Sequence, residues 1–175
     1  MGFGSAIKGL TGGINPAALG RRVIRVGTFE DIKTESAPSG AAAVNLFRVW
    51  GGEVMVTGMY GIVTETIGVA LCQMGPVHTP TGGAVVDMCT VSASIADDPV
   101  NTIYCWDGTV AGAAIGPAGA GAVGVGIGIA SFGANFQILV EGIIGLQVEV
   151  VADEGAIDWI LHYIPLDPNA VVNAI

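Results

Sequence analysis

The stretch Ile157-Asp-Trp-Ile-Leu-His-Tyr-Ile164 gives the clearest indication of how this chain folds. Bulky apolar and aromatic side chains occupy every second position in it, and a β-strand places alternate side chains on opposite faces of a sheet. Period two over eight residues is therefore typical of a strand that covers a core with one face. The first face carries Ile157, Trp159, Leu161 and Tyr163, and the second carries Asp158, Ile160, His162 and Ile164.

The same texture extends over most of the chain. From Val44 onward, short runs of β-branched and aromatic residues alternate with glycine turns, and nowhere do apolar residues recur at helical spacing for three turns. We therefore predict an all-β fold, a small antiparallel β-sandwich or barrel that is jelly-roll-like. The predicted strands are 44–50, 53–64, 68–73, 84–93, 102–106, 123–130, 136–140, 143–151 and 156–164.

Two connections predict tight hairpins. Gly51-Gly52 separates the first two predicted strands, and two glycines at such a connection suit a two-residue turn. Asp153-Glu154-Gly155 separates the last two, and we expect the clearest hairpin of the chain there.

Residues 1–43 have a different character, and we expect them to form an extended N-terminal arm with little regular structure. They are rich in glycine and small residues, and 36–43 is too poor in large side chains to pack alone. Asn15-Pro16 is suited to open one short helix, because asparagine caps and proline fits the first turn. The β-domain then spans 44–175. No apolar run near Met1 has the length of a signal peptide, so we expect cytosolic synthesis.

Charge divides the chain at nearly the same place. All six lysines and arginines occur by Arg48, where the net charge is +3, and the remaining 127 residues carry a net charge of −12. One end can therefore attract an acidic surface that the other end repels. A saline habitat would also enrich Asp and Glu, although it explains less well why the cations gather before Arg48.

The charge and hydropathy patterns argue against two classes of partner. An overall charge of −9 disfavours nucleic acid, because phosphate binding depends on neutralising cations. Residues 108–140 are uncharged over 33 positions, which exceeds the roughly 20 that cross a bilayer. Pro117, a dense glycine series and the absence of flanking Lys or Arg disfavour a membrane span there. We expect neither nucleic acid nor membrane as a partner.

Composition favours an oligomer. Charged residues make up only 12% of the chain and there are 28 glycines, about half and about twice their usual shares. Such a surface is suited to burial between subunits. If 123–129 is a strand, Gly124, Gly126 and Gly128 form a bare stripe that another backbone can approach. Our hypothesis is a subunit contact, and the alternative is an internal packing groove.

The sequence shows no signature of an enzyme. GxSxG, HExxH and Walker motifs are absent, and the GxGxxG match at 119–124 lacks the strand before it and the helix within it. His78 is expected in an exposed loop over 76–80, and His162 is expected to be structural. We predict no catalytic residue and no cofactor.

Other reactive side chains receive structural interpretations. Cys72, Cys89 and Cys105 are too widely spaced for a metal motif and are expected to be buried thiols. The acidic pairs Asp97-Asp98 and Asp153-Glu154 lie at predicted turns. They could hold Ca²⁺ if symmetry gathered several copies, but no EF-hand pattern is present and we predict no metal. A glycan-binding β-sandwich is a further alternative, in which tryptophan rings would be stacking platforms for sugars. The three tryptophans lie in predicted strands, which favours core packing instead: Trp50, Trp106 and Trp159.

Two segments resemble a module of tailed-bacteriophage virion proteins. Asn45-Leu-Phe-Arg-Val-Trp-Gly-Gly-Glu-Val-Met-Val-Thr-Gly-Met-Tyr-Gly-Ile-Val-Thr64 resembles the opening of that small β-domain. Asp158-Trp-Ile-Leu-His-Tyr-Ile-Pro-Leu-Asp-Pro-Asn-Ala-Val-Val172 resembles its closing strand and tail. Together they bracket most of the predicted β-domain.

The resemblance implies a structural virion protein that decorates and cements the capsid. Its implied partners are the major capsid protein and further copies of itself, with which it would form a homotrimer. It implies a place on the capsid surface after synthesis in the host cytoplasm. The basic arm would lie along an acidic capsid surface or a neighbouring subunit, and three arms acting together would bind strongly. A tail, neck or head-fibre protein is the alternative. The hypothesised capsid or subunit contacts are Arg21, Arg22, Arg25, Lys33, Arg48, Gly124, Gly126 and Gly128.

Overall fold

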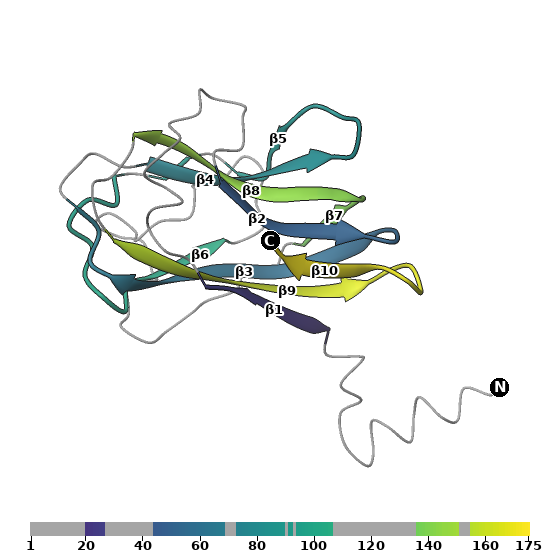
Figure 1. The fold of residues 1–175 in the computed structure, drawn as a ribbon, viewed down its shortest axis with the longest axis horizontal. Helices are drawn as coiled ribbons and strands as arrows, with labels where there is room; N and C mark the ends of the chain where they lie inside the picture. Colours follow the sequence, from purple (N-terminus) through teal and green to yellow (C-terminus); the bar gives the residue numbers. More distant parts are fainter. Residues whose placement is uncertain are drawn as a thin grey trace, which may run out of the picture.

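The chain forms a sandwich of two β-sheets (Figure 1). A computed structural model describes residues 20–26, 44–68, 73–89, 91–92, 94–106, 136–150 and 155–175. Each sheet has five strands, all pairings are antiparallel, and the described residues contain no helix. The prediction of an all-β sandwich is confirmed at this level.

The order of strands mixes early and late parts of the chain. The first sheet runs β1 (Arg21–Arg25), β9 (Ala156–Pro165), β3 (Val54–Glu65) and β6 (Ile103–Trp106), and β7 (Gln137–Leu139) also pairs with β3. The second runs β10 (Val171–Ala174), β2 (Val44–Trp50), β8 (Gly142–Val150), β4 (Gln73–Pro80) and β5 (Val86–Asp87). Chain neighbours therefore often lie in different sheets.

β9 supplies a large part of the core, as its period-two pattern predicts. Ile157, Trp159, Leu161 and Tyr163 are all buried in the hydrophobic cluster between the sheets. Trp159 pairs with Gly61 of β3, where a Cβ would lie 3.0 Å from the indole. Glycine at this position lets a large ring pack directly over the neighbouring strand.

The Gly51-Gly52 connection carries the chain from the second sheet to the first. Gly51 and Gly52 have φ angles of 73° and 130°, in the region that only glycine enters at low cost. A Cβ on Gly51 would collide with the Asn169 carbonyl, and one on Gly52 with the Asp167 side chain. The corner is therefore shaped by close contact with the connection between β9 and β10.

The two connections are also joined by hydrogen bonds. The backbone N–H of Glu53 donates to the Asp167 carboxylate over 2.7 Å, and the Leu166 N–H donates to the Glu53 carbonyl over 2.9 Å. β2 pairs with β10 in one sheet, and β3 pairs with β9 in the other. Two chain segments thus remain paired while they cross together from sheet to sheet.

Both predicted hairpins are wrong, for the same reason. The strands exist, but β2 and β3 lie in different sheets, and so do β8 and β9. A glycine-rich connection is compatible with a hairpin or with a sheet-to-sheet corner, and distant residues decide between them. Residues 151–154 lie outside the described residues.

The other strand predictions vary in accuracy. Those at 44–50, 53–64, 102–106, 136–140, 143–151 and 156–164 correspond to β2, β3, β6, β7, β8 and β9. Of the strand expected at 68–73, residues 69–72 lie outside the described residues, and β4 begins at Gln73. Among the described residues of 84–93, the strand is Val86–Asp87. The sequence did not predict β4, because it contains Pro76 and Pro80 and proline cannot donate a hydrogen bond to a β-ladder. Both prolines nevertheless lie within the pairing with β8, opposite Leu146 and Gly142, while β5 pairs with Val77 and His78.

The expected arm also needs correction at β1. Arg21–Arg25 is not irregular; it pairs with β9 over its full length and forms an edge of the first sheet. The alternation around Val23 is too short to identify a strand locally, and Val23 packs against the core. The predicted helix start at Asn15-Pro16, the loose segment 36–43 and the predicted strand 123–130 lie outside the described residues.

The two side edges of the sandwich differ. At one side β1 contacts β10 across the sheets, and the Arg25 Nε donates a hydrogen bond of 2.8 Å to the carbonyl of Ile175. At the other side a cavity lies between β4, β5 and the segment around β7. We call the β1–β10 side the closed edge.

The corner makes a stability prediction with a matched control. Gly51 and Gly82 have nearly equal φ angles, 73° and 74°, but a Cβ on Gly82 meets nothing within 4 Å. Gly82→Ala should therefore reduce the free energy of unfolding by the backbone term alone, about 1 kcal/mol. Gly51→Ala adds a collision with the Asn169 backbone and should cost about 1 to 3 kcal/mol more. Urea denaturation measures the free energy of unfolding of both variants. Equal losses would contradict the close packing of Gly51 against the connection between β9 and β10.

Candidate functional site

The hypothesised contact residues fall into three groups. Arg21 and Arg22 are exposed on β1, while Arg25 is half-buried and bonded to Ile175. Arg48 is half-buried on β2. Lys33, Gly124, Gly126 and Gly128 lie outside the described residues.

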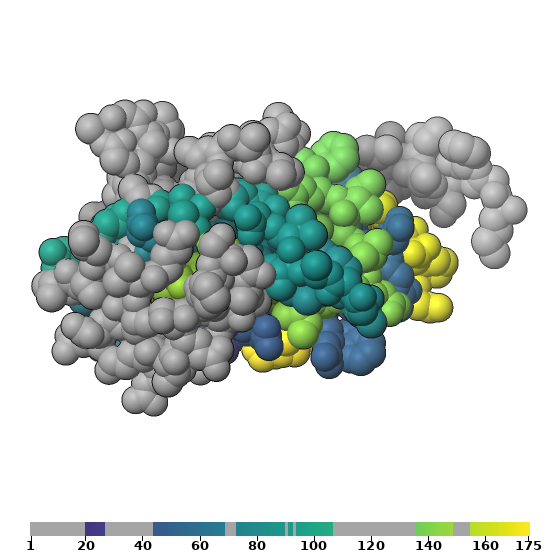
Figure 2. All heavy atoms as spheres, turned by 90° about the horizontal axis from the view of Figure 1, so that it is seen from above, coloured from purple at the N-terminus to yellow at the C-terminus, as the bar shows by residue number. Residues whose placement is uncertain are grey.

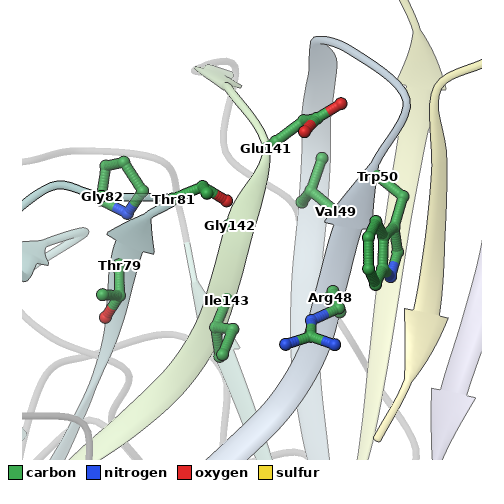
Figure 3. Close-up of a pocket in the computed structure, with 10 residues that line it drawn as sticks. Arg48, Val49, Trp50, Thr79, Thr81, Gly82, Glu141, Gly142 and Ile143 are labelled. Atoms are coloured by element: carbon green, nitrogen blue, oxygen red, sulfur yellow. The ribbon is translucent and has the colours of Figure 1, made fainter.

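The structure brings Arg48 into a pocket on the outer face of the second sheet. Figure 2 views the molecule from this side, where the β4–β5 segment and β8 lie next to each other. The pocket has a volume of about 370 Å³. Its walls come from β2, from the end of β4 with the turn after it, and from the start of β8 (Figure 3): Arg48, Val49, Trp50, Thr79, Pro80, Thr81, Gly82, Glu141, Gly142 and Ile143.

Strand alternation on β2 places an aromatic and a cationic side chain together. Val49 points into the core, so Arg48 and Trp50 on either side of it point outward. The Arg48 guanidinium carbon lies 4.8 Å from the centroid of the Trp50 ring, a cation–π contact. Trp50 nevertheless keeps 49% of its surface exposed. The Trp50 ring therefore holds the Arg48 guanidinium at the pocket, and about half of the tryptophan surface stays open to solvent.

The opposite wall is polar and closely packed. The Thr81 N–H donates to the Glu141 carbonyl over 2.9 Å, which joins the turn after β4 to the start of β8. Next to it, a Cβ on Gly142 would collide with the Thr79 carbonyl, so glycine allows the two backbones to approach. Thr79, Thr81 and Glu141 bring two hydroxyls and one carboxylate to the lining of the pocket, with Glu141 at its upper end in this view (Figure 3).

The tryptophans divide between the two roles considered for them. Trp106 and Trp159 are only 2% and 1% exposed, as expected for core residues. Trp50 is not a core residue. No local pattern signals its outward orientation. Strict alternation from Val44 and Leu46 would place Trp50 on their buried face, and the register shift between Asn45 and Phe47 turns it outward.

His78 was expected in an exposed loop, and the structure shows otherwise. It lies on β4, is 5% exposed, and lines a second cavity of about 370 Å³ between the sheets. Among the described residues neither ring nitrogen has a hydrogen bond of ordinary geometry. Burial lowers the pKa of His78, and the nearby Ile143 carbonyl opposes this effect in part. The prolines at 76 and 80 favour a loop in the sequence, but the segment is a strand because it pairs with β8, which lies far along the chain.

His162 stacks with Tyr60 on the outer face of the first sheet, with ring centroids 6.0 Å apart. Burial and then the charge of Arg22 lower its pKa.

Asp98 lies in the predicted turn and accepts a hydrogen bond of 2.7 Å from the Tyr104 hydroxyl. Burial raises the pKa of Asp98 despite that bond.

The remaining candidates show no assembled metal site. In the described ranges, no three residues among His, Cys, Asp and Glu are grouped to hold a metal ion. Cys89 is buried and Cys105 half-buried, and Cys72 lies outside the described residues. None of the described segments forms a helix with the length and apolar character needed to cross a bilayer.

Comparison with protein families, with curated proteins and with solved structures finds no match to this chain.

The site predicts how the tryptophan fluorescence responds to quenching. Of the three tryptophans, only Trp50 offers a large exposed surface. Trp50→Phe should therefore remove most of the acrylamide-accessible emission and leave the shielded emission of Trp106 and Trp159. Stern–Volmer titrations measure the accessible fraction. An unchanged fraction would contradict the outward orientation of Trp50.

The buried His78 predicts a pH dependence of stability. Burial holds the pKa of His78 below its usual value in the folded protein, so the unfolded chain takes up protons that the folded chain does not. The free energy of unfolding should fall as the pH drops from about 7 to about 5. His78→Leu should reduce that fall, while His162→Gln should retain the His78 part of it. Urea denaturation at several pH values measures the slopes; a His78→Leu slope equal to wild type would contradict the burial of His78.

Proposed function

We propose that this chain is a structural virion protein of a tailed phage that decorates and stabilises the capsid as an oligomer, and that it is not an enzyme. The observation that carries the proposal is the pairing of the two segments that resemble the phage module. Residues 45–64 cover all but one end residue of each of β2 and β3, and residues 158–172 cover most of β9 and the start of β10. These are the strands that cross together between the sheets, so the resemblance concerns one structural unit.

The distribution of cations supports a contact through the closed edge. Every arginine among the described residues is on β1 or β2, the strands that flank β10. Arg25 is bonded to Ile175 and Arg48 stacks on Trp50, so Arg21 and Arg22 remain the exposed pair. In an oligomer, several such edges would act on the lattice together, and modest contacts would add to strong binding.

Other parts of the proposal rest on the sequence. The arm contributes Lys33, and the stripe of Gly124, Gly126 and Gly128 contributes a contact between copies. A homotrimer and a jelly-roll connection of the sandwich belong to the same proposal. A tail, neck or head-fibre protein is the alternative location for the same domain.

Electron cryomicroscopy of intact virions that contain this protein tests the location. Capsid decoration predicts density that repeats over the head at lattice symmetry axes. Density confined to the tail or neck would overturn the decoration role in favour of the alternative.

Binding to undecorated heads tests the contact surface. Deleting residues 2–19 removes the part of the arm that precedes β1, with Lys8, and keeps β1, which a longer deletion would destroy. This deletion, and Arg21→Gln with Arg22→Gln, should each weaken binding by about tenfold or more at low salt. Thr64→Glu with Val100→Glu is the charge-matched control, because it makes the same change in net charge at exposed positions away from β1. Equal loss in the control, or undiminished binding of both test variants, would remove the closed edge from the mechanism.

A further inference from the structure

We infer that the pocket between Arg48, Trp50 and Glu141 binds a saccharide that carries a carboxylate. This inference concerns the outer face of the second sheet and is independent of the proposed capsid role. It goes beyond that role because it assigns a small-molecule binding site to the chain.

The aromatic part of the site is Trp50. Its ring is 49% exposed, in contrast to the two buried tryptophans, and it forms one side of a pocket rather than an isolated surface position. Indole rings provide a flat apolar surface with a polar edge, and they suit ligands with one apolar face and one hydrated face. The apolar C–H face of a pyranose ring is such a surface, and it can stack on the part of the ring that Arg48 leaves uncovered.

Arg48 supplies recognition of the carboxylate. The contact with the Trp50 ring, at 4.8 Å, orients a planar guanidinium that carries five N–H donors. Such a fork binds a carboxylate through two parallel hydrogen bonds. Arg48 and Glu141 line the same pocket but form no ion pair among the described contacts, so the guanidinium is not neutralised across the pocket.

The opposite wall distinguishes a saccharide from a simple anion or an acidic peptide. Glu141 would repel a second negative charge, but it accepts hydrogen bonds from sugar hydroxyls. Thr79 and Thr81 add hydroxyls that both donate and accept. The volume of about 370 Å³ lies at the small end of the range for ligand sites, which suits one or two sugar rings.

Titration with methyl β-D-glucuronide tests the inference, with methyl β-D-glucoside as the neutral match and acetate as the carboxylate alone. The readout is the NMR signal of the Trp50 indole N–H, assigned through Trp50→Phe. The glucuronide should produce a saturable shift with a dissociation constant of about 1 mM. The glucoside should bind at least about fivefold more weakly, and acetate should cause no saturable shift at the same concentration.

Two variants test the named residues by calorimetry or by ligand-observed NMR. Trp50→Phe should weaken glucuronide binding by about tenfold. Arg48→Gln should reduce the preference for the glucuronide over the glucoside to within about twofold. Phe136→Leu and Arg22→Gln are the matched controls, an exposed aromatic residue and an exposed arginine outside the pocket, and they should bind as wild type.

Three results would overturn the inference: no saturable shift with the glucuronide up to about 50 mM, some fifty times the expected constant; equal binding of acetate; or equal losses in the variants and their controls. Because virion location does not enter this experiment, its failure leaves the capsid proposal untouched.

Discussion

The architecture of the sandwich rests on the paired crossing of β2–β3 and β9–β10 from one sheet to the other. The Asp167 carboxylate and the backbone of Leu166 hold Glu53, and the two glycines before it leave room for the facing connection. Because the strands remain paired on both sides of the corner, the relative position of the sheets is set there. The same crossing brings β10 beside β1 at the closed edge. It also ends β2 at Trp50, so the outer pocket lies directly beside the corner.

How far the sequence predicts this structure depends on the range of the interactions involved. The buried face of β9 follows from alternation within one strand, and the structure confirms it. The Gly51-Gly52 connection is locally compatible with a hairpin, and the residue that decides against one, Asp167, is 114 positions from Glu53. The exposure of Trp50 depends on a register shift near Leu46 that no local pattern signals. His78 was missed because prolines conceal a strand whose partner lies far along the chain.

The charge boundary seen in the sequence has a spatial counterpart in the described residues. Its cations gather on β1 and β2, next to β10, instead of forming a separate basic unit. The proposed capsid contact and the proposed saccharide pocket divide these arginines: Arg21 and Arg22 serve the closed edge, and Arg48 faces the outer pocket with Trp50. Arg21, Arg22 and Arg48 would thereby each lie at a surface where an acidic partner is expected, while Arg25 is bonded to the Ile175 carbonyl.

The pairing of the crossing strands can be measured directly by cross-strand nuclear Overhauser effects in the labelled protein. The paired crossing predicts contacts between the backbones of Val49 and Val172 and of Phe47 and Ala174, together with those of β3 with β9. Contacts between Val49 and Val54 across Gly51-Gly52 would show a hairpin within one sheet. That result would contradict the crossing and, with it, the placement of the closed edge and the outer pocket.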